Sequence, residues 1–188
     1  TPLPKAVRDR RFIFSLGNSL PYKNLPRLLQ AFAEIADSDP DLMLVFAGRG
    51  EGKQHLMQMA RSLGAADRIH FAGQLSDGEI RAYFQHALFF AFPSLIEGFG
   101  LPVLEAMASG CPVLTSNCSS LAEIAGENAV LVDPQSSASI AAGIQRLLTD
   151  PELRQQLAGE GQHRAANFTW QASAEQTLQV YHHLSTVT

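Results

Sequence analysis

Short apolar runs alternate with longer amphipathic stretches along most of the chain, and this alternation constrains the fold more than any other feature. Strands are expected where the apolar runs occur, at residues 11–16, 42–47, 68–72, 88–92, 112–115 and 129–131. Strands that alternate with helix-length segments indicate βαβ units, in which right-handed crossovers join parallel strands. The pattern therefore predicts a three-layer α/β domain around a six-stranded parallel sheet, with additional C-terminal helices.

Capping motifs mark where several of these helices begin. Ser76 with Glu79, and Ser120 with Glu123, have the spacing of capping boxes, in which a hydroxyl and a carboxylate satisfy free amides of the first turn. Asp150 precedes a proline and is expected to cap the helix that follows it. The chain ends in three expected helices, at residues 136–149, 151–167 and 170–184.

Residues 93–110, with the sequence PSLIEGFGLPVLEAMASG, predict a strand end, a glycine loop and a helix start. Pro102 fits the first helical position and disfavours a helical Leu101, so Leu101 is the expected N-cap. Leucine has no side-chain oxygen, so the first amides stay free for water or an anion. Gly98 and Gly100 let the backbone bend and let a ligand approach closely. The stretch therefore predicts a phosphate cradle that lacks the P-loop sequence.

Three charged side chains lie near this cradle or on the loop after the first strand. Glu97 and Glu105 flank the glycine loop, and carboxylates readily accept paired hydrogen bonds from neighbouring hydroxyls. Lys23 stands at a helix entrance, where a cation opposes the helix dipole unless an anion is shared with it. A ligand with diols on both sides of a diphosphate fits this set, and a sugar nucleotide is such a ligand.

The run from Glu97 to Pro102, continued to Glu105, resembles the paired-glutamate motif of retaining glycosyltransferases of the GT-B fold, family 4 (group 1). The similarity continues through GNSLPYKNLPRLLQAFAEI, FAGQLSDGEIRAYFQHA and EAMASGCPVLTSNCSSLAEIAG followed by LVDP, and so covers nearly the whole chain. It implies a Rossmann-like, donor-binding C-terminal domain of a mannosyltransferase-like enzyme.

The resemblance also implies roles for individual residues. Glu105 would hold the ribose hydroxyls, Glu97 would contact the transferred sugar, and Lys23 would bind the diphosphate. The implied donor-binding residues are Gly17, Asn18, Lys23, Glu97, Gly98, Phe99, Gly100, Leu101 and Glu105, with Glu97 and Lys23 as the catalytic groups. Gln74 and Leu75, after the third strand, are weaker candidates for contacts with the base. No metal is expected, because lysine, amides and a helix end hold the diphosphate in this fold.

The sequence departs from the family at Asn18, where many relatives have an arginine that neutralises charge on the leaving diphosphate. An amide donates a hydrogen bond but brings no charge. Stabilisation of the leaving group would then depend more on Lys23 and the helix dipole.

The expected organisation is an interdomain linker remnant at residues 1–10 and a nucleotide-sugar-binding domain at residues 11–188. The acceptor-binding N-terminal domain would lie outside this chain, so donor binding without turnover is expected. The last helix usually returns to that domain in this fold. Part of the face expected to pack, with Trp170, Leu178 and Tyr181, would then be exposed here. A GDP- or UDP-linked sugar is expected, with GDP-mannose slightly favoured. By analogy, the acceptor is a polysaccharide or lipid-linked intermediate at the cytoplasmic membrane face.

Composition narrows the alternatives. A net charge of -4 without a basic stripe argues against a nucleic-acid partner. Two cysteines without a CxxC pattern indicate reduced thiols in a cytoplasmic protein rather than a disulfide or metal site. The sequence leaves open a degenerate, non-catalytic module that acts as an adaptor, and a GT-B sugar-nucleotide epimerase. A flavodoxin-like regulator is disfavoured because no acidic pocket or flavin loop is found.

Overall fold

The computed structural model describes residues 2–36, 38–49 and 52–186. Within this part of the chain six strands form one parallel sheet in the order β3-β2-β1-β4-β5-β6. The strands are β1 (Arg11–Leu16), β2 (Leu42–Ala47), β3 (Ile69–Gly73), β4 (Phe89–Phe92), β5 (Val113–Ser116) and β6 (Val130–Val132). The prediction of a six-stranded parallel sheet is confirmed, and each strand lies where its apolar run was found.

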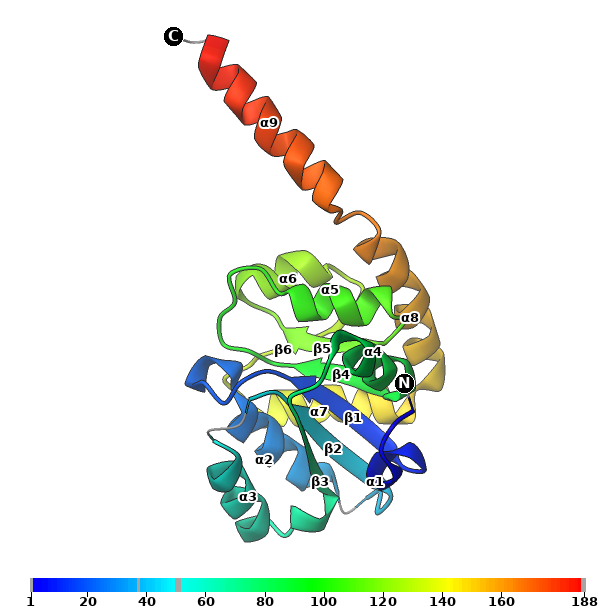
Figure 1. The fold of residues 1–188 in the computed structure, drawn as a ribbon. Helices are drawn as coiled ribbons and strands as arrows, with labels where there is room; N and C mark the ends of the chain where they lie inside the picture. Colours follow the sequence, from blue (N-terminus) through cyan, green and yellow to red (C-terminus); the bar gives the residue numbers. More distant parts are fainter. Residues whose placement is uncertain (1, 37, 50–51, 187–188) are drawn as a thin grey trace.

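Helices cover both faces of the sheet, as Figure 1 shows. One face carries α2 (Leu25–Ala36), α3 (Lys53–Ser62) and α7 (Ser137–Thr149). The other face carries α1 (Lys5–Arg8), α4 (Asp77–His86), α5 (Leu101–Ala108) and α6 (Ser119–Ala125). The helix α8 (Pro151–Ala165) packs against α5 and α7, and 3-10 turns occur at Pro21–Lys23 and Ala66–Arg68. The result is the expected three-layer arrangement.

The strands are apolar on both faces because each face is covered by helices. In β1, Phe12 and Phe14 point into the core beneath α4 and α5, whereas Ile13 points into the core beneath α2 and α7. The Phe14 ring stacks on Tyr83 with centroids 5.0 Å apart. Burial of each such side chain stabilises the fold by about 1.5–3 kcal/mol relative to exposure. The central strand therefore joins two separate cores. Leu3 and Val7 are buried in the core that contains Phe12 and Phe14.

Two of the predicted caps are confirmed. The Ser76 hydroxyl accepts from the Glu79 amide at 3.4 Å, while the Glu79 carboxylate accepts from the Ser76 amide at 2.8 Å. The Asp150 carboxylate accepts from the Leu153 amide at 2.8 Å at the start of α8. Both motifs join residues three apart, so they can be predicted from local sequence where no distant group competes for the capping side chain.

Two predicted helix starts are wrong. The helix α6 begins at Ser119 after Cys118, so Ser120 is not a cap and donates instead to the Glu97 carbonyl at 2.9 Å. The carbonyl of a distant loop has taken the hydroxyl that the local motif would use. The N-cap of α5 is Gly100 rather than Leu101. Gly100 has φ 111°, a left-handed conformation that glycine adopts at low cost, so the turn ends one residue earlier than Pro102 suggested.

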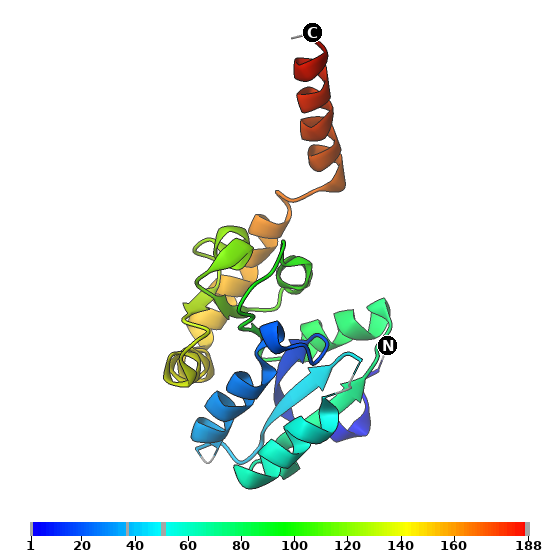
Figure 2. The same cartoon turned by 90° about the vertical axis from the view of Figure 1, so that its left-hand side faces the viewer.

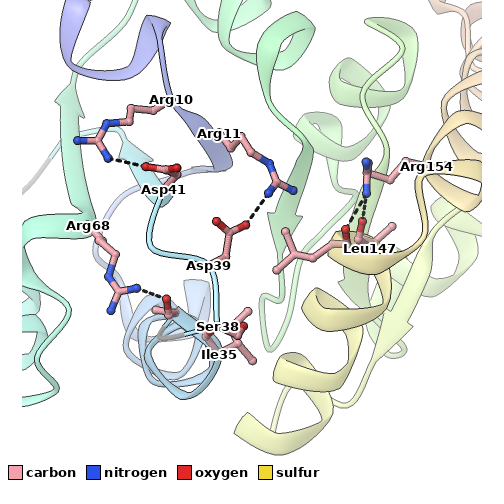
Figure 3. Close-up of polar contacts among 11 residues, drawn as sticks. Arg10, Arg11, Ile35, Ser38, Asp39, Asp41, Arg68, Leu147 and Arg154 are labelled. Atoms are coloured by element: carbon pink, nitrogen blue, oxygen red, sulfur yellow. Dashed lines mark hydrogen bonds and ion pairs between the residues drawn. The ribbon is translucent and has the colours of Figure 1, made fainter.

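Polar contacts close the edge of the sheet at which β1 and β2 begin, as Figure 3 shows. Arg11 donates to Asp39 at 2.7 Å, and Arg10 lies 3.6 Å from Asp41. Arg68 donates to a carbonyl at the end of α2, at Ala36. Exposed ion pairs of this kind contribute about 0–1 kcal/mol each. The opposite edge, where the strands end, is left for the site described below.

The last helix, α9 (Trp170–Thr186), extends away from the sheet and its covering helices (Figures 1 and 2). Trp170, Leu178 and Tyr181 are 82%, 54% and 64% exposed. The expected exposure of this face is therefore confirmed, since no other described element covers these three side chains. No helix among the described residues has both the length and the apolar character that a membrane crossing requires.

Candidate functional site

The candidate site lies where β1 and β4 end side by side. Strand order reverses between these two neighbours, since the chain continues from β1 towards β2 and from β4 towards β5. Open parallel sheets bind ligands outside the carboxyl ends of the strands at such a switch point. Two loops meet there, residues 17–24 after β1 and residues 93–100 after β4. The Tyr22 carbonyl accepts from the Leu95 amide at 2.7 Å and so joins the two loops.

The structure brings together two predicted site residues that are 74 positions apart, Lys23 and Glu97. The Lys23 ammonium lies 2.7 Å from a Glu97 carboxylate oxygen, and each side chain is only 13% exposed. The ammonium also lies 4.7 Å from the centre of the Phe92 ring. The ammonium is bound by one carboxylate and lies over an aromatic ring. It can therefore exchange that carboxylate for another anion.

Gly17 lies beside this ion pair. Its amide donates to the Ala47 carbonyl at 2.9 Å, and a Cβ on Gly17 would lie 3.4 Å from the Lys23 side chain. The loops after β1 and β2 approach so closely that a Cβ on Gly48 would lie 2.0 Å from the Gly17 carbonyl oxygen. Asn18 is exposed, and its side-chain oxygen accepts from the Leu20 amide at 3.4 Å. The Asn18 carbonyl is therefore turned towards its own loop.

The predicted cradle lies on the other side of the ion pair. Gly98 and Phe99 are exposed, and the Phe99 ring contacts Phe168 edge-on at 6.3 Å. Gly100 is buried, while Leu101, the first residue of α5, is 47% exposed. Among the described residues no side chain caps α5. The start of this helix therefore presents backbone amides and a positive dipole end near Glu97.

Glu105 lies in the second turn of α5, on the layer that also contains α4. Glu105 is exposed, but neighbouring protein atoms partly desolvate its carboxyl group and raise its pKa above the ordinary value, and the charge of Asp77 at the start of α4 raises it further. The carboxyl group is therefore harder to ionise than a fully solvated one in the absence of a ligand. A partner that donates hydrogen bonds to it would offset this cost.

The raised pKa predicts how stability depends on pH. A raised pKa means that the folded chain binds this proton more tightly than the unfolded chain does. Glu105 therefore contributes stability that is complete below its ordinary pKa of 4.5 and is lost as the pH rises through the folded-state value. Urea unfolding from about pH 4 to about pH 7 should show a larger loss of stability in the wild-type chain than in Glu105→Gln. Parallel curves for the two proteins would contradict the shift.

Sequence reasoning missed several side chains that brace the loop after β4. Ser116 donates to the Ser94 carbonyl at 2.6 Å, and Ser120 donates to the Glu97 carbonyl. Asn24 donates to the carbonyls of Pro93 and, in the loop after β6, Pro134. Each of these residues follows a predicted strand or precedes a helix at the edge where ligands bind. That placement is the one signal in the sequence that could have identified them.

Neither of the two cavities described here is lined by Lys23 or Glu97. The larger, about 350 Å³, is lined by Gln74 and Leu75, the candidates for base contacts, together with His70 and Tyr83. The smaller, about 160 Å³, lies where β1, β2 and β3 end and is lined by Arg49 and other residues. Arg49 also donates to Gln74 at 3.3 Å, between the two cavities. In the described ranges no group of three histidine, cysteine or acidic side chains could hold a metal ion.

Comparison with known proteins gives consistent matches. A family model described as "Glycosyl transferases group 1" matches residues 4–164. The chain is 36% identical over 174 residues to a D-inositol 3-phosphate glycosyltransferase of Corynebacterium diphtheriae, covering 88% of this chain and 41% of that protein. It is 36% identical over 184 residues to an MMP alpha-(1->4)-mannosyltransferase of Mycolicibacterium hassiacum, covering 95% of this chain and 44% of that protein.

Solved structures agree with these matches. A sucrose-phosphate synthase from Thermosynechococcus elongatus superposes with a TM-score of 0.84 at 30% identity, covering 99% of this chain and 47% of that protein. The chain thus spans less than half the length of each of these three proteins. Its sheet order, its helical layers and its sequence similarity point to one conclusion. The chain belongs to the glycosyl transferases group 1 family, with the Rossmann-like architecture of GT-B glycosyltransferases.

Proposed function

We propose that this chain is the donor-binding half of a retaining glycosyltransferase and binds a nucleoside-diphosphate sugar across the loops after β1 and β4. The observation that carries the proposal is the pair of Lys23 and Glu97, which lies at the switch point beside the uncapped start of α5. A diphosphate would accept hydrogen bonds from the Lys23 ammonium and from the backbone amides of residues 98–101. No metal is needed for this arrangement, because these groups supply the positive charge.

The carboxylates on either side of the diphosphate would hold its two sugars. The Glu97 carboxylate is paired with Lys23. A sugar hydroxyl that donates a hydrogen bond to this carboxylate would leave the Lys23 ammonium available to the phosphates. Glu105 would accept hydrogen bonds from the ribose, which would offset the cost of keeping its carboxylate ionised. The base would then extend towards Gln74 and Leu75 beside the larger cavity. The relatedness to an MMP alpha-(1->4)-mannosyltransferase favours a mannosyl donor.

The acceptor and the other wall of the cleft would come from a second, N-terminal domain outside these residues. The chain spans under half the length of its relatives, which supports this division. The 188-residue chain would therefore bind donor without transferring sugar. Sugar transfer by this chain at a rate comparable to that of a full-length enzyme would contradict the division.

Calorimetric titration of GDP, UDP and ADP into the chain, with and without EDTA, tests the proposal directly. Selective binding of one nucleotide, unchanged by EDTA, is the expected result. The corresponding sugar nucleotide should also bind, because its sugar hydroxyls can donate hydrogen bonds to the Glu97 carboxylate. Absence of binding by a chain that unfolds cooperatively would contradict the proposal and would favour a non-catalytic module.

A further inference from the structure

Asn24 lies where the loops after β1, β4 and β6 meet. The residue is 4% exposed, and its side-chain amide nitrogen donates to the Pro93 carbonyl at 2.9 Å and to the Pro134 carbonyl at 2.7 Å. Its oxygen accepts from Arg27 at 2.7 Å. Both N–H groups of the amide are thus used, and each connects a different loop to the loop after β1.

The backbone of Asn24 is as specialised as its side chain. It adopts the left-handed conformation, with φ 60° and ψ 25°, where it ends the 3-10 turn Pro21–Lys23 and leads into α2. Asparagine tolerates this region better than most residues, and glycine tolerates it best. Aspartate would place a carboxylate against two carbonyl oxygens. Asparagine therefore combines the required turn with two hydrogen-bond donors.

The hydrogen bonds of the Asn24 side chain lie immediately beside the ion pair of Lys23 and Glu97. Before Lys23, the Tyr22 carbonyl accepts from Leu95; after Lys23, Asn24 donates to Pro93. Lys23 is thus held on both sides to the loop that carries Glu97. The bond on the Tyr22 side is between backbone groups, whereas the bond on the Asn24 side depends on a side chain. Only the second can be removed by substitution.

We propose that Asn24 is a positioning residue, which fixes the loop after β1 against the loop after β4 so that Lys23 and Glu97 meet in the geometry that a diphosphate and a sugar require. Asn24 acts through Lys23 and does not itself contact the ligand. The geometric half of this proposal concerns the ion pair alone. The half that concerns ligands rests on the proposed function.

The geometric half is tested by the energetic coupling between Lys23→Ala and Glu97→Gln. A double-mutant cycle in urea unfolding measures this coupling, first with Asn24 present and then with Asn24→Gly. Glycine keeps the left-handed turn and removes only the side-chain bonds. The coupling is expected to fall to about half or less without the amide. A coupling that stays unchanged would overturn the proposal, whether or not the chain binds nucleotides.

Two further variants keep the test decisive. Asn128→Gly removes an amide that donates to the Ala125 carbonyl at 3.3 Å, outside the site, and should leave the coupling intact. Asn24→Ser retains a small side chain with a single donor. It replaces Asn24→Gly if that variant does not fold, and the expected loss of coupling is the same in direction. An equal loss in Asn128→Gly would show a general effect of destabilisation and would overturn the positioning role.

The ligand half is tested with the nucleotide that the wild-type chain prefers and with the matching nucleoside, which lacks the diphosphate. Asn24→Gly is expected to weaken the nucleoside diphosphate about tenfold while leaving the nucleoside within about twofold. Equal losses for both ligands would show that Asn24 supports the fold rather than Lys23, and would overturn the proposal. If the wild-type chain binds neither ligand, the proposed function fails, and the coupling measurement still decides the role of Asn24.

Discussion

Replacing Gly48 with alanine is expected to lower the free energy of unfolding by about 3–5 kcal/mol, the sum of backbone strain and overpacking. Gly48 has φ 135°, a conformation that a residue with a Cβ rarely adopts. The added Cβ would lie 2.0 Å from the Gly17 carbonyl oxygen and 2.7 Å from its carbonyl carbon. These neighbours are backbone atoms, so no side-chain rotation can relieve the clash. Urea unfolding of the variant and the wild-type chain measures the loss.

Gly64→Ala is the matched control for this prediction. Gly64 also has a positive φ, 70°, but no heavy atom of the described neighbours lies within 4 Å of its Cβ position. Its substitution should cost about 1 kcal/mol, from strain alone. Equal losses for the two variants would mean that the loops after β1 and β2 separate freely. A larger loss for Gly48→Ala would show that they are packed together, and the shift of Gly17 would also disturb Lys23.

Lys23→Ala and Glu97→Gln are expected to change the affinity for the free nucleoside diphosphate in opposite directions. Loss of the ammonium should weaken binding about 100-fold, or about 2.7 kcal/mol, because a partly buried charge-assisted hydrogen bond is lost. Glu97→Gln should strengthen binding about tenfold, because the diphosphate no longer competes with a carboxylate for the ammonium. Calorimetric titration of the preferred nucleotide measures both changes.

The sugar nucleotide separates this competition from simple repulsion. Glu97→Gln removes a charged acceptor for the sugar hydroxyls. The sugar nucleotide should therefore gain less affinity from this substitution than the free nucleoside diphosphate gains. Lys5→Ala and Glu127→Gln make the same chemical changes at exposed positions away from the site and should leave both affinities unchanged. Weaker binding of the free diphosphate to Glu97→Gln would show that Glu97 does not compete with it for Lys23.

The sequence predicted the sheet well because buried parallel strands form continuous apolar runs. Every strand lies within two residues of its prediction, and the caps at Ser76 and Asp150 follow from residues close in sequence. Prediction failed where a local motif competes with a distant group. Ser120 has the spacing of a capping box, but its hydroxyl donates to Glu97 in another loop. No local pattern contains that information.

The sequence nominated residues for the candidate site but did not predict the hydrogen bonds among them. Lys23 and Glu97 were each chosen as ligand groups, and the structure shows them bound to one another. The position of Asn24 before α2 could be noticed in the sequence, but its hydrogen bonds could not be predicted, because its acceptors at Pro93 and Pro134 lie 69 and 110 positions further along the chain. Hydrogen bonds of this range exist only after the sheet has brought the loops together. The sequence therefore suggested which groups would contact a ligand, whereas the contacts among those groups depend on tertiary structure.

The separation of α9 from the rest of the chain determines how unfolding proceeds. Every described side chain of α9 except Ala172 is exposed, so its helix–coil equilibrium depends on local propensity and not on either core. Most of the stability of a helix in a folded protein comes from packing an apolar face against other elements, and the exposed side chains of α9 do not supply such packing. Its amides therefore exchange with solvent through local fraying, while those of the central strands exchange only when the sheet opens. A single two-state transition consequently describes the sheet and its covering helices but not the chain as a whole.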